Sequence, residues 1–276
     1  MNRSVYFAAC SFAMMALAVP VCRAGNLEPL RAHCTIGLSD DWGGKRDARR
    51  SETGKFSLRI EDEDCSGERH CGSSYSNSNE AFSRFTGISE ADLSHEGAQL
   101  TATLAAEAGT FTCSGTVRDR ELGGTAVFTP DAGFVKRLGE MGFAETDSKK
   151  LEAYAFVGVE SGWARSLKET GIAGMDADKL IPLRIFNVTP AYIHSMTEMG
   201  YELPDADKLI AMRVQGVDPA EVREIRGMGY KPTLDELIQC RIFKITPEFI
   251  RQMEARNLKH LTIEKLVQIR IFKLDE

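Results

Sequence analysis

Apolar residues in the second half of the chain recur with the spacing of short amphipathic helices, and the whole pattern returns about every 29 residues. Each copy holds two segments with apolar residues three or four positions apart, the period of a helix with one buried face. A unit of this kind buries its apolar face only against its neighbours. The pattern therefore predicts an α-solenoid of five helix-turn-helix units, which span residues 131–159, 160–188, 189–217, 218–245 and 246–274.

Capping residues mark the predicted helix ends. Asp, Glu or Thr starts the first helix, and three units continue with Pro, which suits the first helical position because no N–H is needed there. Gly, or Asn in the last unit, ends this helix because both accept the left-handed conformation. The predicted starts are Asp131, Glu160, Thr189, Asp218 and Thr246, and the predicted stops are Gly142, Gly171, Gly200, Gly229 and Asn257. The second helices are predicted to start at Asp147, Asp176, Asp205, Thr233 and Thr262.

Positions that are apolar in every unit are predicted to face the core. In the first helix an aromatic residue recurs, with Glu221 as the exception, at Phe134, Trp163, Tyr192 and Phe249. In the second helix three rows are predicted to be buried: Leu151, Leu180, Leu209, Leu237 and Leu266; Tyr154, Leu183, Met212, Cys240 and Ile269; and Phe156, Ile185, Val214, Ile242 and Ile271. Cys240 is thus expected to be a buried, inert packing thiol.

One arginine recurs near the end of the second helix in four units, at Arg184, Arg213, Arg241 and Arg270, whereas the first unit has Ala155. We expect a structural role, because a cation there favours the negative helix end and can pair with the acidic cap of the next unit. Recognition of an anionic polymer is the alternative. Since the recurrent residues explain the fold, the candidate partner-binding residues are cationic positions that differ between units: Arg137, Lys168, His194, Arg223 and Arg251.

The first half of the chain has shorter stretches in which apolar and polar residues alternate, the period of a half-buried strand. These stretches are 56–60, 99–104, 111–117 and 125–128. The charged segment from Arg118 to Gly124 separates the last two, which predicts a hairpin. Residues 25–130 are therefore expected to form a small, mostly antiparallel β domain, and the chain as a whole to belong to the α+β class.

Residues 1–24 have the pattern of a signal peptide: Arg3, an apolar run from Val5 to Val19, Pro20, and small residues before the cleavage point. The run is shorter than the roughly 20 residues that cross a bilayer. A lipoprotein would use Cys22, but bulky Val21 precedes it where a small residue is expected. The sequence thus predicts a periplasmic or secreted protein without a membrane span.

Export changes what the cysteines mean, because disulfides persist outside the cytoplasm. Cys34, Cys65, Cys71 and Cys113 all lie in the first half. Four cysteines allow three connectivities, of which we favour Cys34–Cys113 with Cys65–Cys71. The alternative is a metal site using His33-Cys34 and His70-Cys71, but this spacing matches no zinc pattern with two ligands two to four residues apart.

Composition argues against several functions. The net charge of -6 offers no cationic surplus for nucleic acid. The acidic run from Glu61 to Asp64 lacks the glycine-punctuated spacing of a calcium loop, so we expect a solvated loop and no cofactor. The sequence contains no nucleophile elbow, zinc-protease helix, phosphate-binding loop or Ser-x-x-Lys motif, which favours a non-catalytic protein.

Two segments carry a resemblance to a known family. The pattern Thr189-Pro190-x-Tyr192-Ile193, Met199-Gly200-Tyr201, Leu209-Ile210, Arg213-Val214 and Val217 resembles the helical repeats behind the membrane peptidase part of some antirepressor metallopeptidases of the β-lactam-sensor type. The segments 108–115 and 124–130 resemble the β segment before those repeats. The likeness covers about residues 85–276, without the peptidase helix or the membrane helices, so it implies an extracytoplasmic accessory or sensor-like module and transfers no catalytic residue.

These observations predict an exported interaction protein that binds a protein partner through its helical repeats. An envelope sensor that binds a ligand through the β domain is the first alternative, and an uncharacterised hydrolase is the second. Self-association through the outer face of the last repeat is a further expectation.

Overall fold

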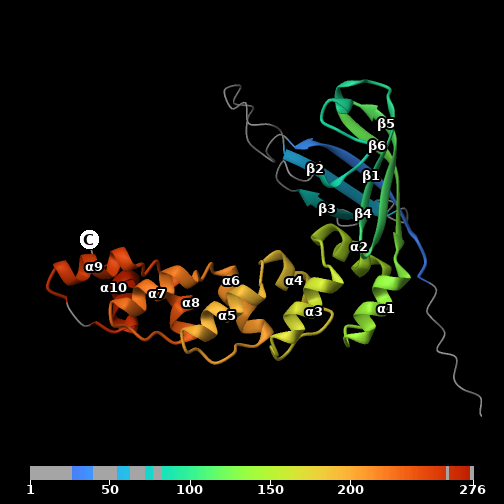
Figure 1. Ribbon diagram of the computed structural model, residues 1–276. Helices are drawn as coiled ribbons and strands as arrows, with labels where there is room; N and C mark the ends of the chain where they lie inside the picture. Colours follow the sequence, from blue (N-terminus) through green and yellow to red (C-terminus); the bar gives the residue numbers. More distant parts are fainter. Residues whose placement is uncertain (1–26, 40–54, 63–71, 77–82, 259–260, 274–276) are drawn as a thin grey trace, which may run out of the picture.

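The computed structural model describes residues 27–39, 55–62, 72–76, 83–258 and 261–273. In this part of the chain an antiparallel sheet is followed by a row of helices that extends away from it (Figure 1). The predicted signal peptide, Cys65, Cys71 and the last two residues of the acidic run, Glu63 and Asp64, lie outside the described residues. No helix among the described residues is long and apolar enough to cross a membrane.

The sheet has six described strands, and every neighbouring pair is antiparallel. Their spatial order is β3-β2-β1-β6-β5-β4. The strands are β1 (Leu30–Ser39), β2 (Lys55–Asp62), β3 (Gly72–Ser76), β4 (Gln99–Ala106), β5 (Gly109–Arg118) and β6 (Glu121–Pro130). The four strands expected from alternation are confirmed, and β1 and β3 are additions to the prediction.

The hairpin between β5 and β6 is confirmed, but its predicted loop was too long. Only Asp119 and Arg120 connect the strands, with φ of 51° and 63°, the left-handed pair that matches the twist of a two-residue hairpin. Gly123 and Gly124 therefore lie inside β6. A Cβ on Gly124 would come within 2.0 Å of the Ser114 carbonyl oxygen, so Gly124 permits a close approach of β5 and β6 rather than a turn.

A disulfide joins Cys34 of β1 to Cys113 of β5, as favoured from the sequence. Both strands flank β6, so a flat sheet would place them about 9.5 Å apart. Their Cα atoms are 6.1 Å apart, which requires a strongly coiled sheet. Gly124 pairs with Cys34 across the ladder, so no side chain of β6 stands there. The disulfide also removes Cys34 from the alternative metal site.

Ten α-helices follow in the described residues, two per unit. The first helices are α1 (Ala132–Glu140), α3 (Ser161–Glu169), α5 (Pro190–Glu198), α7 (Pro219–Gly227) and α9 (Pro247–Ala255). The second helices are α2 (Ser148–Val157), α4 (Leu180–Ile185), α6 (Ala206–Val214), α8 (Leu234–Ile242) and α10 (Ile263–Ile271). Each second helix contacts the second helix of the next unit along the row.

The predicted caps hold, with two exceptions. The five predicted stops all have positive φ, between 64° and 93°. Eight of the ten predicted start residues accept a hydrogen bond at the first turn of their helix. Glu160 makes no such bond. Asp176 accepts from the Lys179 amide, but α4 starts only at Leu180, because Pro182 has no N–H to continue a helix from Asp178.

One hydrophobic cluster spans the sheet and the first helices. Helix α2 packs against β4, β5 and β6. The Phe156 ring at its end lies edge-on to Phe111 of β5, with centroids 5.0 Å apart. The sheet is therefore fixed to one end of the helical row, and α9 and α10 lie at the other end (Figure 1).

Candidate interaction surface

The candidate partner-binding residues lie on the first helices, and the structure does not bring them into one site. Arg137 contacts Glu107, Lys168 contacts the Met141 carbonyl and the Phe143 ring, and Arg251 pairs with Glu224 and Glu248. His194 lies 3.0 Å from Glu198 and is 72% exposed. Arg223 is exposed. Their role in binding remains a prediction, and four of the five already hold intramolecular contacts.

Glu107, in the hairpin between β4 and β5, explains why Glu160 does not cap α3. Its carboxylate accepts hydrogen bonds from the Ser161 amide at 2.8 Å and from the Ser161 hydroxyl. It also lies 2.9 Å from Nη2 of Arg137. Burial raises the pKa of Glu107, but the bonds from Ser161 and the charge of Arg137 outweigh this and lower it. A residue of the sheet thus caps a helix of the second unit and fixes the two parts together.

The recurrent arginines stack on the recurrent aromatic residues of the same unit. The guanidinium carbon lies over the Trp163 ring for Arg184, over Tyr192 for Arg213 and over Phe249 for Arg270, at 5.4, 4.9 and 3.8 Å from the ring centroid. A cation over an aromatic face is attracted by the ring quadrupole. The aromatic position and the arginine position are therefore one structural pair.

In the fourth unit, which has Glu221 at the aromatic position, the recurrent arginine also contacts the residue at that position. Glu221 replaces the aromatic residue, and Arg241 forms an ion pair with it instead of a stack. The smaller side chain leaves a hollow beside it, lined in part by Cys240. We read this hollow as a packing consequence of Glu221.

Two of these arginines, Arg213 and Arg241, also cap the helix of the preceding unit, which corrects one expectation. We expected a pairing with the acidic cap of the next unit. Instead, Nε of Arg213 donates to the Phe186 carbonyl at 2.9 Å, and Nε of Arg241 donates to the Gln215 carbonyl at 3.4 Å. Phe186 and Gln215 end α4 and α6, so each cation satisfies a free carbonyl at a negative helix end.

A ladder of ion pairs that the sequence analysis missed joins the second helices. Lys150 pairs with Asp178, and the same two positions one and two units later give Lys179 with Asp207 and Lys208 with Asp235. The fourth unit has Glu236 at the lysine position, which forms a capping box with Thr233 instead. A lysine and an acid about 28 residues apart were the signal in the sequence.

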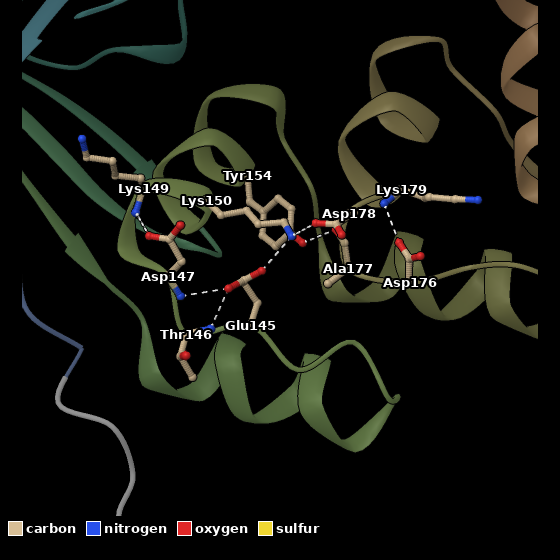
Figure 2. Close-up of polar contacts among 10 residues, drawn as sticks. All are labelled: Glu145, Thr146, Asp147, Lys149, Lys150, Tyr154, Asp176, Ala177, Asp178 and Lys179. Carbon is tan, nitrogen blue, oxygen red and sulfur yellow. Dashed lines mark hydrogen bonds and ion pairs between the residues drawn. The ribbon is translucent and has the colours of Figure 1, made fainter. Parts of the chain in front are cut away.

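The first rung of this ladder has the least exposed lysine, Lys150 at 19%, and Figure 2 shows the groups around it. Lys150 lies between Asp178 and Glu145, with Nζ 2.9 Å from Glu145. Burial lowers the pKa of Lys150, but the two carboxylates outweigh it and raise it. The Tyr154 hydroxyl donates to the Ala177 carbonyl at 2.6 Å, and burial raises the pKa of that hydroxyl. These contacts join the first two units.

The last predicted core row is wrong in four units. Ile185, Val214, Ile242 and Ile271 are 57%, 47%, 51% and 51% exposed. The reason is the helical period. Val214 is five residues after buried Leu209, about 140° around the helix at 3.6 residues per turn, so it faces away from the core. We call these four residues, which occupy equivalent positions of successive second helices, the apolar band.

The other core predictions hold, except that Trp163 and Ile269 are only partly buried. The leucine row of the second helix is 2% exposed or less, and Cys240 is 3% exposed. Burial raises the pKa of the Cys240 thiol to about 12, so it stays protonated and unreactive at neutral pH. Among the described residues, no cluster of three or more His, Cys, Asp or Glu is arranged to hold a metal ion.

Comparisons of the chain with protein-family models, with curated proteins and with solved structures give no match. The apolar band and the contacts around it are the features of the described residues that bear on function.

Proposed function

We propose that this protein is an exported, non-catalytic interaction module, in which five helix-turn-helix units form an α-solenoid that binds a protein partner. The apolar band carries the proposal. A single exposed isoleucine is ordinary, but an aliphatic residue is exposed at one equivalent position in four consecutive units. Exposed apolar rows of this kind mark protein-binding surfaces.

The arrangement of the helices supports the solenoid. Helices α2, α4, α6, α8 and α10 contact one another in sequence, and the Lys–Asp ladder repeats between them. Helices α5, α7 and α9 form contacts in the same order. Stacked units of this kind offer an extended surface with little chemistry, which suits binding.

Two features support export. The buried disulfide between Cys34 and Cys113 is typical of an oxidising compartment. Residues 1–24 have the pattern of a signal peptide. A location in the periplasm or outside the cell also agrees with the proposed likeness to the extracytoplasmic part of antirepressor metallopeptidases.

The apolar band places the proposed binding surface on the second helices, whereas the candidate residues chosen from the sequence lie on the first helices. Arg137, Lys168 and Arg251 are engaged within the chain, whereas the band residues are 47–57% exposed. His194 and Arg223 are exposed on the first helices and serve as controls for the alternative surface.

The test is quantitative capture from an envelope extract by three forms of the protein. We expect the double variant Val214→Asp/Ile242→Asp to lose a partner that the wild type retains. The matched control, His194→Ala/Arg223→Ala, should retain it. Loss of the partner with the control alone would move the binding surface to the first helices, and retention by every form would contradict binding through the helices.

A further inference from the structure

The apolar band continues an interface that already exists within the chain. Its equivalent in the first unit is Phe156, which packs against Phe111 of the sheet. Arg84 donates to the Phe156 and Ala155 carbonyls at 2.5 and 2.9 Å, which closes the end of α2. The sheet therefore covers the first position of the row, and a partner that follows the row must begin beside the sheet, at α4.

The exposed surface is more than one side chain wide. Each band residue follows another apolar residue by one helical turn, which places both on the same side of the helix. The preceding residue is half-buried in three helices and buried in α10. The four pairs are Ile181 with Ile185, Ile210 with Val214, Ile238 with Ile242, and Val267 with Ile271.

The spacing of the band selects the conformation of its occupant. Packed helices lie about 8–10 Å apart, so the band presents one apolar residue at roughly this interval. Seven residues of an α-helix rise about 10.5 Å and return to nearly the same face. Residues on one face of a strand recur about every 6.6–6.8 Å. A strand that places one side chain on the first band residue would therefore have no side chain at the distance of the second.

A row of acids runs beside the band. Asp178, Asp207 and Asp235 each precede a band residue by seven positions. They are 86%, 72% and 74% exposed, whereas their ladder lysines are only 19–34% exposed. The carboxylates therefore dominate what a partner meets on this side, and cationic side chains complement them.

The geometry points to an amphipathic α-helix of about 22 residues as the occupant. It crosses α4, α6, α8 and α10 with an apolar side chain every seventh residue, and carries Lys or Arg on the flank that faces the acids. This inference rests on the proposed function, since it specifies the part of the protein partner that the band binds.

Two synthetic 22-residue peptides of identical composition test the inference against the full chain by fluorescence anisotropy. In the first, leucines at seven-residue spacing share one helical face with lysines along one flank. In the second, the same residues alternate with period two. We expect the helical peptide to bind at least about tenfold more tightly, a difference of about 1.4 kcal/mol, and to gain helical circular dichroism on binding.

The variants assign the binding to the band. The double variant Val214→Asp/Ile242→Asp should bind the helical peptide at least about tenfold more weakly than the wild type. The control His194→Ala/Arg223→Ala should bind it with unchanged affinity. All substituted residues are largely exposed, so unchanged thermal unfolding of each variant confirms its fold. Equal or tighter binding of the alternating peptide through the band would overturn the helix and leave the proposed function standing.

Two other outcomes overturn the inference differently. If the chain alone sediments as a dimer that the band variant dissociates, the band binds a second copy rather than a partner helix. If neither peptide binds and the band variant still captures every native partner, the inference and the proposed function both fail.

Discussion

Replacing Glu107 with alanine removes the contact that fixes the sheet to the second unit. The carboxylate caps the α3 amide of Ser161 and pairs with Arg137. Loss of this cap leaves the buried Ser161 amide without a partner, which costs about 1–3 kcal/mol. Arg137 is 40% exposed and keeps Asp131 at 3.8 Å, so its share stays below about 1 kcal/mol.

We therefore expect Glu107→Ala to lower the free energy of unfolding by about 1–3 kcal/mol, measured by urea denaturation at pH 7. At about 2–4 °C per kcal/mol, the melting temperature should fall by several degrees. The control is Glu198→Ala, whose partner His194 is 72% exposed, and which should change stability by less than about 0.5 kcal/mol. An equally small change for Glu107→Ala would refute the capping role.

The pH dependence gives a second reading of the same contact. The folded pKa of Glu107 is lowered, so its stabilisation is present above the unfolded pKa of about 4.3 and is lost as the pH falls through the folded pKa. The difference between wild type and Glu107→Gln should therefore be largest at neutral pH and shrink in strong acid. A difference that grows on acidification would contradict the charge-assisted cap.

Three further predictions concern stability. Cys34→Ser/Cys113→Ser opens a loop whose ends are 79 residues apart and should cost about 4.5 kcal/mol on the chain-entropy model; an unchanged melting temperature under reducing conditions would argue against the bond. Glu221→Phe restores the aromatic partner of Arg241 and fills the hollow beside it, so denaturation should show a gain of about 0.5–1 kcal/mol, and a loss above 1 kcal/mol would exclude the stack. Lys150→Met leaves Glu145, 12% exposed, without its cation and should cost about 1–3 kcal/mol; Lys136→Met, at a 78% exposed position, is the control, and equal effects would contradict the buried first rung.

Features governed by neighbouring residues could be predicted from the sequence. The caps at Thr189 and Thr246 and the glycine stops follow from local hydrogen bonding and from the left-handed conformation. The buried leucine row follows from the helical period and from its recurrence. Even Glu221, which breaks the aromatic row, becomes understandable once Arg241 is placed beside it.

The features that were not predicted depend on contacts between residues far apart in the sequence, or on the angular position of a residue around its helix. Glu107 caps Ser161 across 54 residues, and no local pattern announces such a contact. Recurrence alone placed Val214 in the core, although its angle from Leu209 puts it on the outer face. Strand β3, Gly72–Ser76, has too few apolar residues to show alternation, so only its pairing with β2 makes it a strand.

The central claim is that the apolar band is the docking surface, and site-specific photo-cross-linking in the native envelope tests it most directly. A photoreactive residue at Val214 or Ile242 should give one discrete adduct with a partner, and the same residue at Arg223 should give none. Adducts from Arg223 alone would contradict the account.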